Sequence, residues 1–269
     1  MPVALTNGLV RMIDIGAPDL SNNISDAGRL EHILTRELNT DYVKIPLHIL
    51  KSLPSRLRRF NFKAKAVLFK DPHSWILVDL IDADGQDPVL GVAIDIGTTR
   101  IVLNLLDLET GNVIGEKGFD NPQAQIGPDV LARIHYSNKP GGLEELHDLV
   151  IDSVNSHIRG LCREHGFKTE KIYLVTGAGN TAMTHFFLGV EAFEIIKEPY
   201  IPCVNIPNSI SARELGLDIN RNGYTFLFPN IGSYFGGDLI AGILFSRLNE
   251  KQKPSLMVDM GTNAEIVVG

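Results

Sequence analysis

A short segment that occurs twice constrains the fold of this chain more than any other feature. Residues 94–98 read IDIGT and residues 258–262 read VDMGT, which places Asp95 and Asp259 164 positions apart. Each copy follows one apolar run and precedes another, the pattern of strand, loop and strand. The separation is too long for a short-period repeat array. We therefore interpret the two copies as a duplication in which each of two lobes begins with the same β-hairpin.

The residue types in these hairpins suit the binding of phosphate groups. An aspartate at a strand end can hold a hydrated Mg²⁺ ion through water, which predicts that role for Asp95. Gly97 is expected to turn the backbone with positive φ, so that N–H groups and the hydroxyls of Thr98 and Thr99 point at phosphate oxygens. Either copy alone is also compatible with nothing more than a tight hairpin turn. The second loop provides a matching set of phosphate-binding candidates: Asp259, Gly261, Thr262 and Asn263.

A third segment, residues 231–238, ends in Gly-Gly-Asp directly before an apolar helix. Asp238 is therefore expected near a helix N-terminus, where the helix dipole favours a carboxylate. We predict that Asp238 orients or deprotonates the water that attacks the terminal phosphate. The alternative is that Asp238 only caps the helix.

Residues 175–181, which read VTGAGNT, end a predicted strand and begin a predicted helix. Gly177, Gly179 and Asn180 either contact phosphate or only close a tight strand-to-helix turn, and the residues leave both interpretations open. The segment lacks the lysine of a Walker loop, which excludes a P-loop.

Two differently patterned units follow one another along the chain. Residues 1–88 favour a small α+β unit, with helices over 27–37 and 47–57 and strands over 62–69 and 75–81; Pro54 should break the second helix. The turn-forming run 82–88 marks the boundary. The remainder predicts a mixed sheet covered by helices. Its strands are expected over 91–96, 101–108, from 113 onward, 171–175, 224–228 and 256–259, and its helices over 129–136, 143–165, 180–188 and 238–248.

The composition argues against several other classes of protein. A net charge of −7 gives no basic footprint for nucleic acid. The most apolar long stretch, residues 234–245, is too short and too polar to span a bilayer, and the N-terminus lacks the pattern of a signal peptide. Cys162 and Cys203 lie in unrelated contexts, so we expect neither a disulfide nor a metal cluster, and a cytoplasmic location.

Four segments of the sequence are similar to one superfamily. They are residues 92–99, residues 121–134 with their NPQ and GPDV runs, residues 179–185, and the GGD run at 236–238 followed by residues 258–265. The chain resembles the ASKHA superfamily of sugar and acetate kinases, chaperone ATPases and actin, and within it the reductive activators of corrinoid proteins. Glu265, in the last segment, is a further candidate for the site.

The resemblance implies both a fold and a division of the chain. The expected fold is an α/β, actin-like (ribonuclease H-like) ATPase lobe with a mixed sheet covered by helices. This first lobe would occupy residues 89–255, after a small α+β linker unit over residues 1–88. Residues 256–269 would begin a second lobe, and the sequence stops before that lobe's adenine pocket. We interpret the chain as a fragment or as a split or decayed gene product.

The activity of the family is ATP-driven repair of cobalamin-dependent methyl transfer. Inactive Co(II) corrinoid is reduced to Co(I), and ATP binding and hydrolysis drive the protein conformations that make this reduction possible. The resemblance therefore implies ATP and Mg²⁺ as ligands and a corrinoid protein as partner, and it is compatible with a homodimer.

The electron in this family comes from an N-terminal plant-type [2Fe–2S] domain held by four cysteines. The present sequence contains two cysteines in all. We therefore expect no iron–sulfur cluster in this chain, and an electron donor or ferredoxin-like domain supplied separately.

Two other functions stay open at this point. A small-molecule kinase of the same superfamily, of the sugar or acetate type, would use the same hairpins, and one added substrate would raise its ATP turnover. A truncated module that binds a partner and hydrolyses nothing is the non-enzymatic alternative. The intact Asp95, Asp238 and Asp259 argue against a decayed site.

Overall fold

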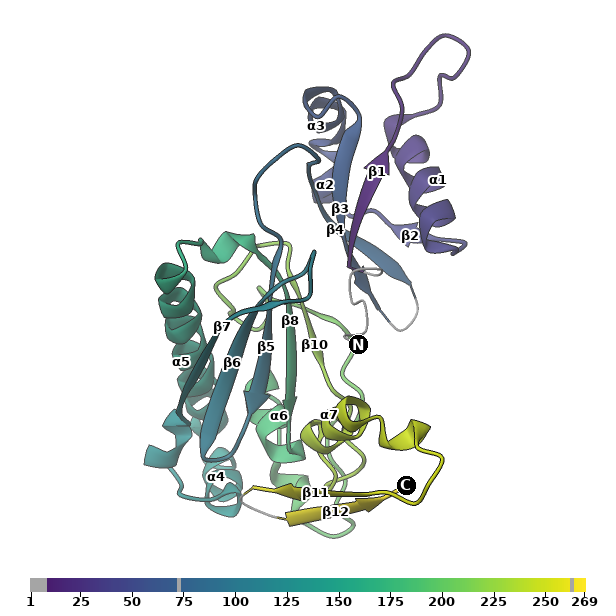
Figure 1. The fold of residues 1–269 in the computed structure, drawn as a ribbon. Coiled ribbons are helices and arrows are strands. Elements are labelled where there is room, and N and C mark those ends of the chain that lie inside the picture. The colour runs from purple at the N-terminus through teal and green to yellow at the C-terminus, as the bar shows by residue number, and fades with distance from the viewer. Residues whose placement is uncertain (1–8, 72–73, 262–263) are drawn as a thin grey trace.

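The structure is a computed structural model that describes residues 9–71, 74–261 and 264–269 (Figure 1). Its N-terminal unit is a four-stranded sheet in the order β1-β3-β4-β2, with three helices packed on one face. The elements of this unit are β1 (Val10–Asp14), α1 (Asp26–Leu38), β2 (Val43–Lys44), α2 (Leu47–Leu50), α3 (Leu53–Arg59), β3 (Lys63–Lys70) and β4 (Trp75–Asp82).

Local capping explains where α1 begins. The Oγ atom of Ser25 accepts a hydrogen bond from the N–H of Gly28 at 3.1 Å, which satisfies one of the unpaired donors of α1. The helix predicted over residues 47–57 is instead two helices, because α2 ends at Leu50 and α3 begins at Leu53. Pro54 lies in the first turn of α3, where a missing N–H breaks no intrahelical bond. The segment is therefore broken as expected, but the break falls before Pro54, at the start of the second helix.

The second unit is a six-stranded mixed sheet in the order β7-β6-β5-β8-β10-β9. Strands β5, β6 and β7 form an antiparallel meander, and β8 and β10 run parallel to β5. With helices packed against the sheet, this is the predicted actin-like lobe, so the fold class is confirmed (Figure 1). Its elements are β5 (Leu90–Ile96), β6 (Arg100–Asp107), β7 (Val113–Asp120), η2 (Pro122–Gln125), α4 (Val130–Ser137), α5 (Gly142–Glu164), η3 (Thr169–Lys171), β8 (Ile172–Gly179), α6 (Thr181–Leu188), η4 (Phe193–Ile195), β9 (Ile210–Ser211), β10 (Tyr224–Leu227), α7 (Gly237–Ser246) and η5 (Leu248–Glu250).

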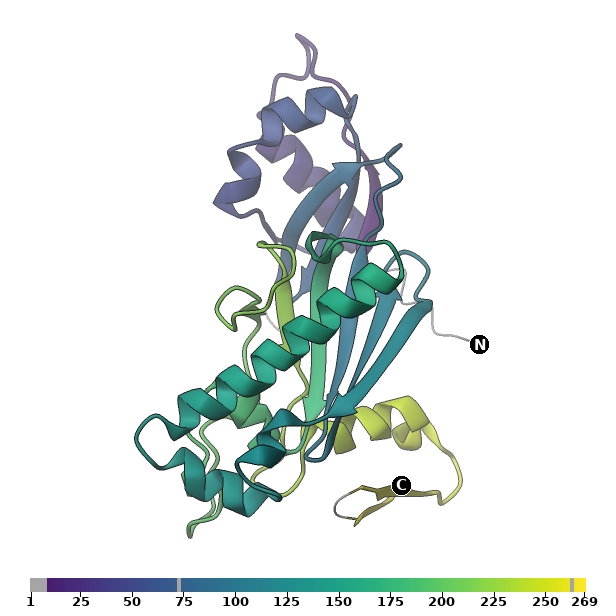
Figure 2. The same cartoon turned by 90° about the vertical axis from the view of Figure 1, so that its left-hand side faces the viewer.

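The two faces of β5 carry different residues. Ile94 and Ile96 are buried in the main core, together with Val150 and Val154 of α5, the long helix that covers this face of the sheet (Figure 2). Because side chains alternate along a strand, Asp95 points to the opposite face. The apolar pattern of the strand therefore decides on which side of the sheet its aspartate lies.

Strands β11 (Leu256–Met260) and β12 (Ala264–Val268) form a separate antiparallel hairpin beside α7. In its register Asp259 lies opposite Glu265, so both acidic residues share one face of the hairpin. Thr262 and Asn263, both predicted to bind phosphate, lie outside the described residues.

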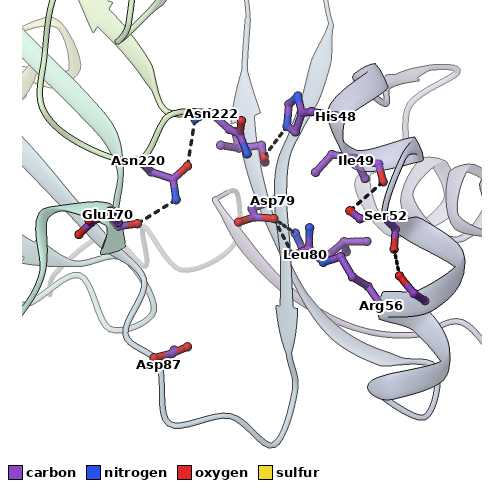
Figure 3. A network of polar contacts seen from close by, with 12 residues as sticks. His48, Ile49, Ser52, Arg56, Asp79, Leu80, Asp87, Glu170, Asn220 and Asn222 are labelled. Carbon is purple, nitrogen blue, oxygen red and sulfur yellow. Dashed lines mark hydrogen bonds and ion pairs between the residues drawn. The ribbon is translucent and has the colours of Figure 1, made fainter.

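The N-terminal sheet packs against the end of the second sheet through a shared apolar cluster. Phe69 of β3 stacks on Tyr224 of β10 with ring centroids 5.3 Å apart, and Val78 of β4 is buried in the same cluster as Tyr173 of β8. Polar contacts border this cluster, among them Arg56 to Asp79 at 2.7 Å within the first unit (Figure 3).

Another contact joins the two units directly. Lys171 forms an ion pair with Asp87 at 2.8 Å. Tyr173 lies buried at the same junction, where burial, together with the charges of Asp79 and Asp87, raises the pKa of its hydroxyl. The two sheets are thus held together by apolar burial as well as by charge.

Candidate functional site

Three separate parts of the chain border one cavity of about 630 Å³. The first is the β5–β6 loop, the second is the start of the helices α6 and α7, and the third is the β11–β12 hairpin. The residues that line the cavity are Asp95, Gly97, Thr98, Thr99, Arg100, Asn180, Asp238, Asp259, Gly261 and Glu265. The two copies of the duplicated segment therefore meet at one site.

The β5–β6 loop requires a glycine at position 97 for space, and not for a left-handed backbone conformation. Gly97 is absent from the described glycines with positive φ, so the predicted positive φ was wrong. A Cβ atom at this position would lie 2.2 Å from the carbonyl oxygen of Arg100, a clash with backbone that the loop could not relieve cheaply. Glycine is required here because the two sides of the hairpin approach each other closely.

Asn180 connects the first loop to helix α6. Its Nδ2 atom donates to the Oγ1 atom of Thr98 at 2.9 Å, and its Oδ1 atom caps α6 by accepting from the N–H of Met183 at 3.0 Å. The same residue therefore begins a helix and supports the loop, which agrees with the turn interpretation, and a contact of Asn180 with phosphate stays a prediction.

Gly177 and Gly179 lie within strand β8, which continues to Gly179 and does not end at Val175 as predicted. Neither glycine is among the residues that line the cavity. An added Cβ atom would lie 2.6 Å from a methyl carbon of Leu227 at the first position and 2.7 Å from the carbonyl oxygen of Ile96 at the second. Packing across the sheet explains both glycines.

Asp238 lies in the first turn of α7, next to the cavity. Its capping alternative was wrong in detail, because Gly236 is the N-cap residue and the Oδ1 atom of Asp238 accepts from the N–H of Leu239 at 2.8 Å. A Cβ atom at Gly236 would lie 2.4 Å from the Cα atom of Asn180. The glycine thus lets α7 begin directly beside α6, which brings Asp238 to Asn180.

Carboxylates dominate the electrostatics of the cavity. Burial raises the pKa of Asp95, and the charges of Asp238 and Asp259 raise it further, although the side chain itself is open to the cavity. Burial also raises the pKa of Asp238, although the hydrogen bond from the N–H of Leu239 lowers it in part. The pKa of Glu265 is raised by burial as well. Four carboxylates and one arginine line the cavity, and such an excess of negative charge favours a bound cation.

The donor set suits a hydrated Mg²⁺ ion. Among the described residues, no three acidic, histidine or cysteine side chains are close enough together to hold a metal ion directly. Mg²⁺ keeps several of its waters and needs only one or two carboxylates in addition to substrate phosphates. Asp95 and Asp259, on opposite hairpins, fit that requirement.

We expect Asp95→Asn to stabilise the protein at neutral pH when divalent cations are absent. The raised pKa of Asp95 means that its contribution to stability is full below the ordinary value of 3.8 and is lost as pH rises through the folded-state value. The thermal midpoint of the variant should therefore exceed that of the parent by up to about 3 °C at pH 7, and by nothing near pH 4. Thermal melts in EDTA across this range test the prediction, and a lower midpoint at pH 7 would contradict it.

Sequence reasoning missed Arg100, which lines the cavity directly after the first loop. The only available signal was its position next to Thr99. A second cavity of about 620 Å³ adjoins the first and shares Asn180, Asp238 and Glu265 with it. Its other walls include Ile134, Leu239 and the half-exposed Tyr200, so it is far more apolar.

The cysteines lie away from this site. Cys162 is buried in α5 and its burial raises the pKa of the thiol to about 11, whereas Cys203 is exposed in a loop. Within the described ranges, no helix combines the length and apolar character needed to cross a membrane.

Comparisons with known proteins agree on one family. The family described as the RACo linker region matches residues 10–87, and the family described as the RACo middle region matches residues 90–251. A corrinoid activation enzyme, RamQ of Eubacterium limosum, is 30% identical over 195 residues, which are 72% of this chain and 32% of RamQ. A solved structure of a reductive activator for a corrinoid, iron–sulfur protein is 35% identical with a TM-score of 0.90, over 97% of this chain and 42% of that one. The chain thus spans less than half the length of these relatives.

Proposed function

This chain belongs to the RACo family through its linker and middle regions, and on that premise we propose that it is the ATPase portion of an activator of corrinoid proteins. One observation carries the proposal: both Asp-x-Gly-Thr hairpins and Asp238 border a single acidic cavity. Two loops that face each other across a cavity can bind the β- and γ-phosphates of ATP from both sides.

Several residues of the cavity then have distinct roles. Asp95 would hold Mg²⁺ through water, and a bound ion would supply positive charge next to the phosphates. The loops that begin at Gly97 and Gly261 bind phosphate through N–H groups and hydroxyls, with Thr98 and Thr99 on the first loop. Asp238 accepts a proton from the water that attacks the γ-phosphate. We extend the phosphate-binding role to Thr262 and Asn263 by the duplication alone.

The remaining parts of the proposal concern partners. One electron from a separate donor or ferredoxin-like domain reduces Co(II) to Co(I), and ATP hydrolysis drives the conformational step that makes this transfer possible. The linker unit would comprise residues 1–88, the first lobe residues 89–255, and residues 256–269 would begin the second lobe. The activator would act in the cytoplasm, alone or as a homodimer.

We expect residues 1–269 to bind Mg-ATP weakly, and the same residues joined to a complete second lobe to bind it well. The described cavity provides contacts for phosphate, whereas adenine contacts would come from the second lobe. Isothermal titration calorimetry on both forms tests this expectation. Tight, adenine-specific binding to residues 1–269 alone would contradict it.

The activity itself is tested by combining the ATPase form with a Co(II) corrinoid protein and a low-potential electron donor. The proposal predicts that the absorption of Co(I) appears only with ATP, and that the corrinoid protein changes the rate of ATP hydrolysis. A rate of ATP hydrolysis that does not change when the corrinoid protein is added would reject the proposed partner. No hydrolysis in either form would favour the non-catalytic binding module.

The adjoining apolar cavity favours a second candidate, a small-molecule kinase. That cavity touches Asp238 and Asn180, so an acceptor hydroxyl bound in it would lie next to the residue proposed to act as base. A kinase would transfer the γ-phosphate to an added sugar or carboxylic acid, and mass spectrometry of the product would identify it.

A further inference from the structure

Three polar side chains lie buried behind the first phosphate loop, and the proposed function does not use them. The exposed fraction is 1% for Asn121, 0% for Gln123 and 0% for Arg133. None of the three is among the residues that line the cavity. Buried polar groups of this kind are stable only when hydrogen bonds compensate for the lost water.

Asn121 donates hydrogen bonds to two backbone carbonyl groups of the loop. Its Nδ2 atom donates to the carbonyl oxygen of Gly97 at 2.8 Å, and its backbone N–H donates to the carbonyl oxygen of Thr99 at 2.8 Å. The C=O and N–H groups of a trans peptide unit point in opposite directions. Holding the Gly97 carbonyl toward Asn121 therefore turns the N–H of Thr98 away from Asn121, while Asn180 holds the hydroxyl of Thr98.

Gln123 and Arg133 set the orientation of Asn121. The backbone N–H of Gln123 donates to the Oδ1 atom of Asn121 at 3.0 Å, which leaves Nδ2 for the loop. The side chain of Gln123 is fixed at both ends, because Nε2 donates to the carbonyl of Leu146 at 2.8 Å and Oε1 accepts from Arg133 at 3.4 Å. Arg133 also donates to the carbonyl of Gly127 at 2.9 Å. These bonds form a continuous chain from helices α4 and α5 to the loop.

We propose that Asn121, oriented by Gln123 and Arg133, is a positioning residue that holds the first phosphate loop in its binding conformation before nucleotide arrives. Asn121 does not touch the nucleotide, and it acts through Gly97 and Thr99. A preset loop does not have to be ordered when ATP binds, which favours affinity. The role in affinity rests on the proposed function, whereas the effect on the loop can be measured without it.

Asn155 of α5 offers a matched control. It is 6% exposed, its Nδ2 atom donates to the carbonyl of Gly216 at 2.8 Å, and its Oδ1 atom accepts from the N–H of Asp218 at 2.8 Å. Asn155→Ala and Asn121→Ala therefore each remove a buried amide with two hydrogen bonds to the backbone. Only Asn121 contacts the phosphate loop.

The experiment compares these two variants with the parent chain by thermal melting, by hydrogen exchange of a peptide covering residues 97–101, and by Mg-ATP titration. Both variants should lower the thermal midpoint. Only Asn121→Ala should speed exchange in residues 97–101 and weaken Mg-ATP binding, each by about tenfold, the effect of one hydrogen bond. If Asn121→Ala does not fold, Asn121→Asp replaces it, because this change keeps the shape and the acceptor for the N–H of Gln123; it removes the donor to Gly97 and adds a negative charge beside that carbonyl oxygen.

The outcomes separate this inference from the proposed function. The inference would be overturned if residues 97–101 of the Asn121 variant exchanged hydrogen at the same rate as in the parent chain. It would also be overturned if Asn155→Ala accelerated exchange in these residues by the same factor. Faster exchange confined to the Asn121 variant supports the inference even if the parent binds no nucleotide. In that case the proposed function would be the part that fails.

Discussion

Asp238→Ala is expected to slow ATP hydrolysis by 10²–10⁴-fold, about 3–5 kcal/mol of activation free energy, while ATP still binds. Asp238 lies in the first turn of α7 and lines the cavity that both hairpins border, so its carboxylate can act on the attacking water. Loss of a base used only in the chemical step leaves the bound ground state nearly unchanged. Because burial raises the pKa of Asp238, the parental rate should increase with pH through a value above the ordinary 3.8. The rate of hydrolysis as a function of pH and the affinity for ATP, measured on the form of the protein that hydrolyses ATP, test both the loss of rate and its pH dependence.

A capping residue provides the control for this prediction. Ser25→Ala removes the N-cap of α1, far from the cavity, and should cost about 1 kcal/mol of unfolding free energy without changing turnover. Asp238→Ala should instead slow turnover at little cost in unfolding free energy, because the N-cap of α7 is Gly236. Parental hydrolysis by Asp238→Ala would reject the role of Asp238 as base.

Asp95→Asn is expected to weaken the binding of Mg²⁺ with ATP by about 10–100-fold, with a parallel loss of turnover. The side chain would hold the ion through water, and removal of such an outer contact typically has an effect of this size. The neutral amide also lowers the negative charge that Asp238 and Asp259 share with Asp95 in the cavity. Titration with Mg-ATP, and with ATP in EDTA, separates the two ligands: the variant should bind ATP in EDTA at least as well as the parent does.

Asp107 is the matched control for this second variant. It lies at the other end of β6, where its carboxylate accepts from the N–H of Glu109 at 2.8 Å in a surface turn. Asp107→Asn removes one negative charge from the same hairpin and should leave Mg-ATP affinity unchanged. If Asp95→Asn bound Mg-ATP normally and slowed only hydrolysis, Asp95 would act in the chemical step and not on the ion.

Local patterns in the sequence were sufficient for the class of fold. The alternation of β5, the turn after β6 and the long apolar stripe of α5 are short-range signals, and each predicted its element within a few residues. The duplicated segment added long-range information, because two copies of one hairpin imply two related lobes. The approach of the two hairpins to one cavity was expected for that reason.

The errors came from residues whose role depends on neighbours distant in the chain. Gly177 and Gly179 appeared to end a strand, but they lie within β8, and close contacts across the sheet explain them. Gly97 does lie in the loop, but the close approach of Arg100 requires a glycine there, and not a positive φ. Pro54 was expected to break the helix over 47–57, and the segment is broken, but the proline lies in the first turn of the second helix, and only the position of that helix start shows this.

The sequence by itself thus determined most of the strands and helices, though not the short strands β1, β2 and β9, and it determined which loops could bind phosphate, because hydrophobic period and turn chemistry are local properties. Only the tertiary structure decided which side chains meet. Sheet order and the close approach of Gly236 to Asn180 bring the start of α7 beside the start of α6, and the chain path after β7 places Asn121 beside Gly97. Such contacts join elements far apart in sequence, and their geometry is set by packing of the whole lobe, for which no short segment carries a signal.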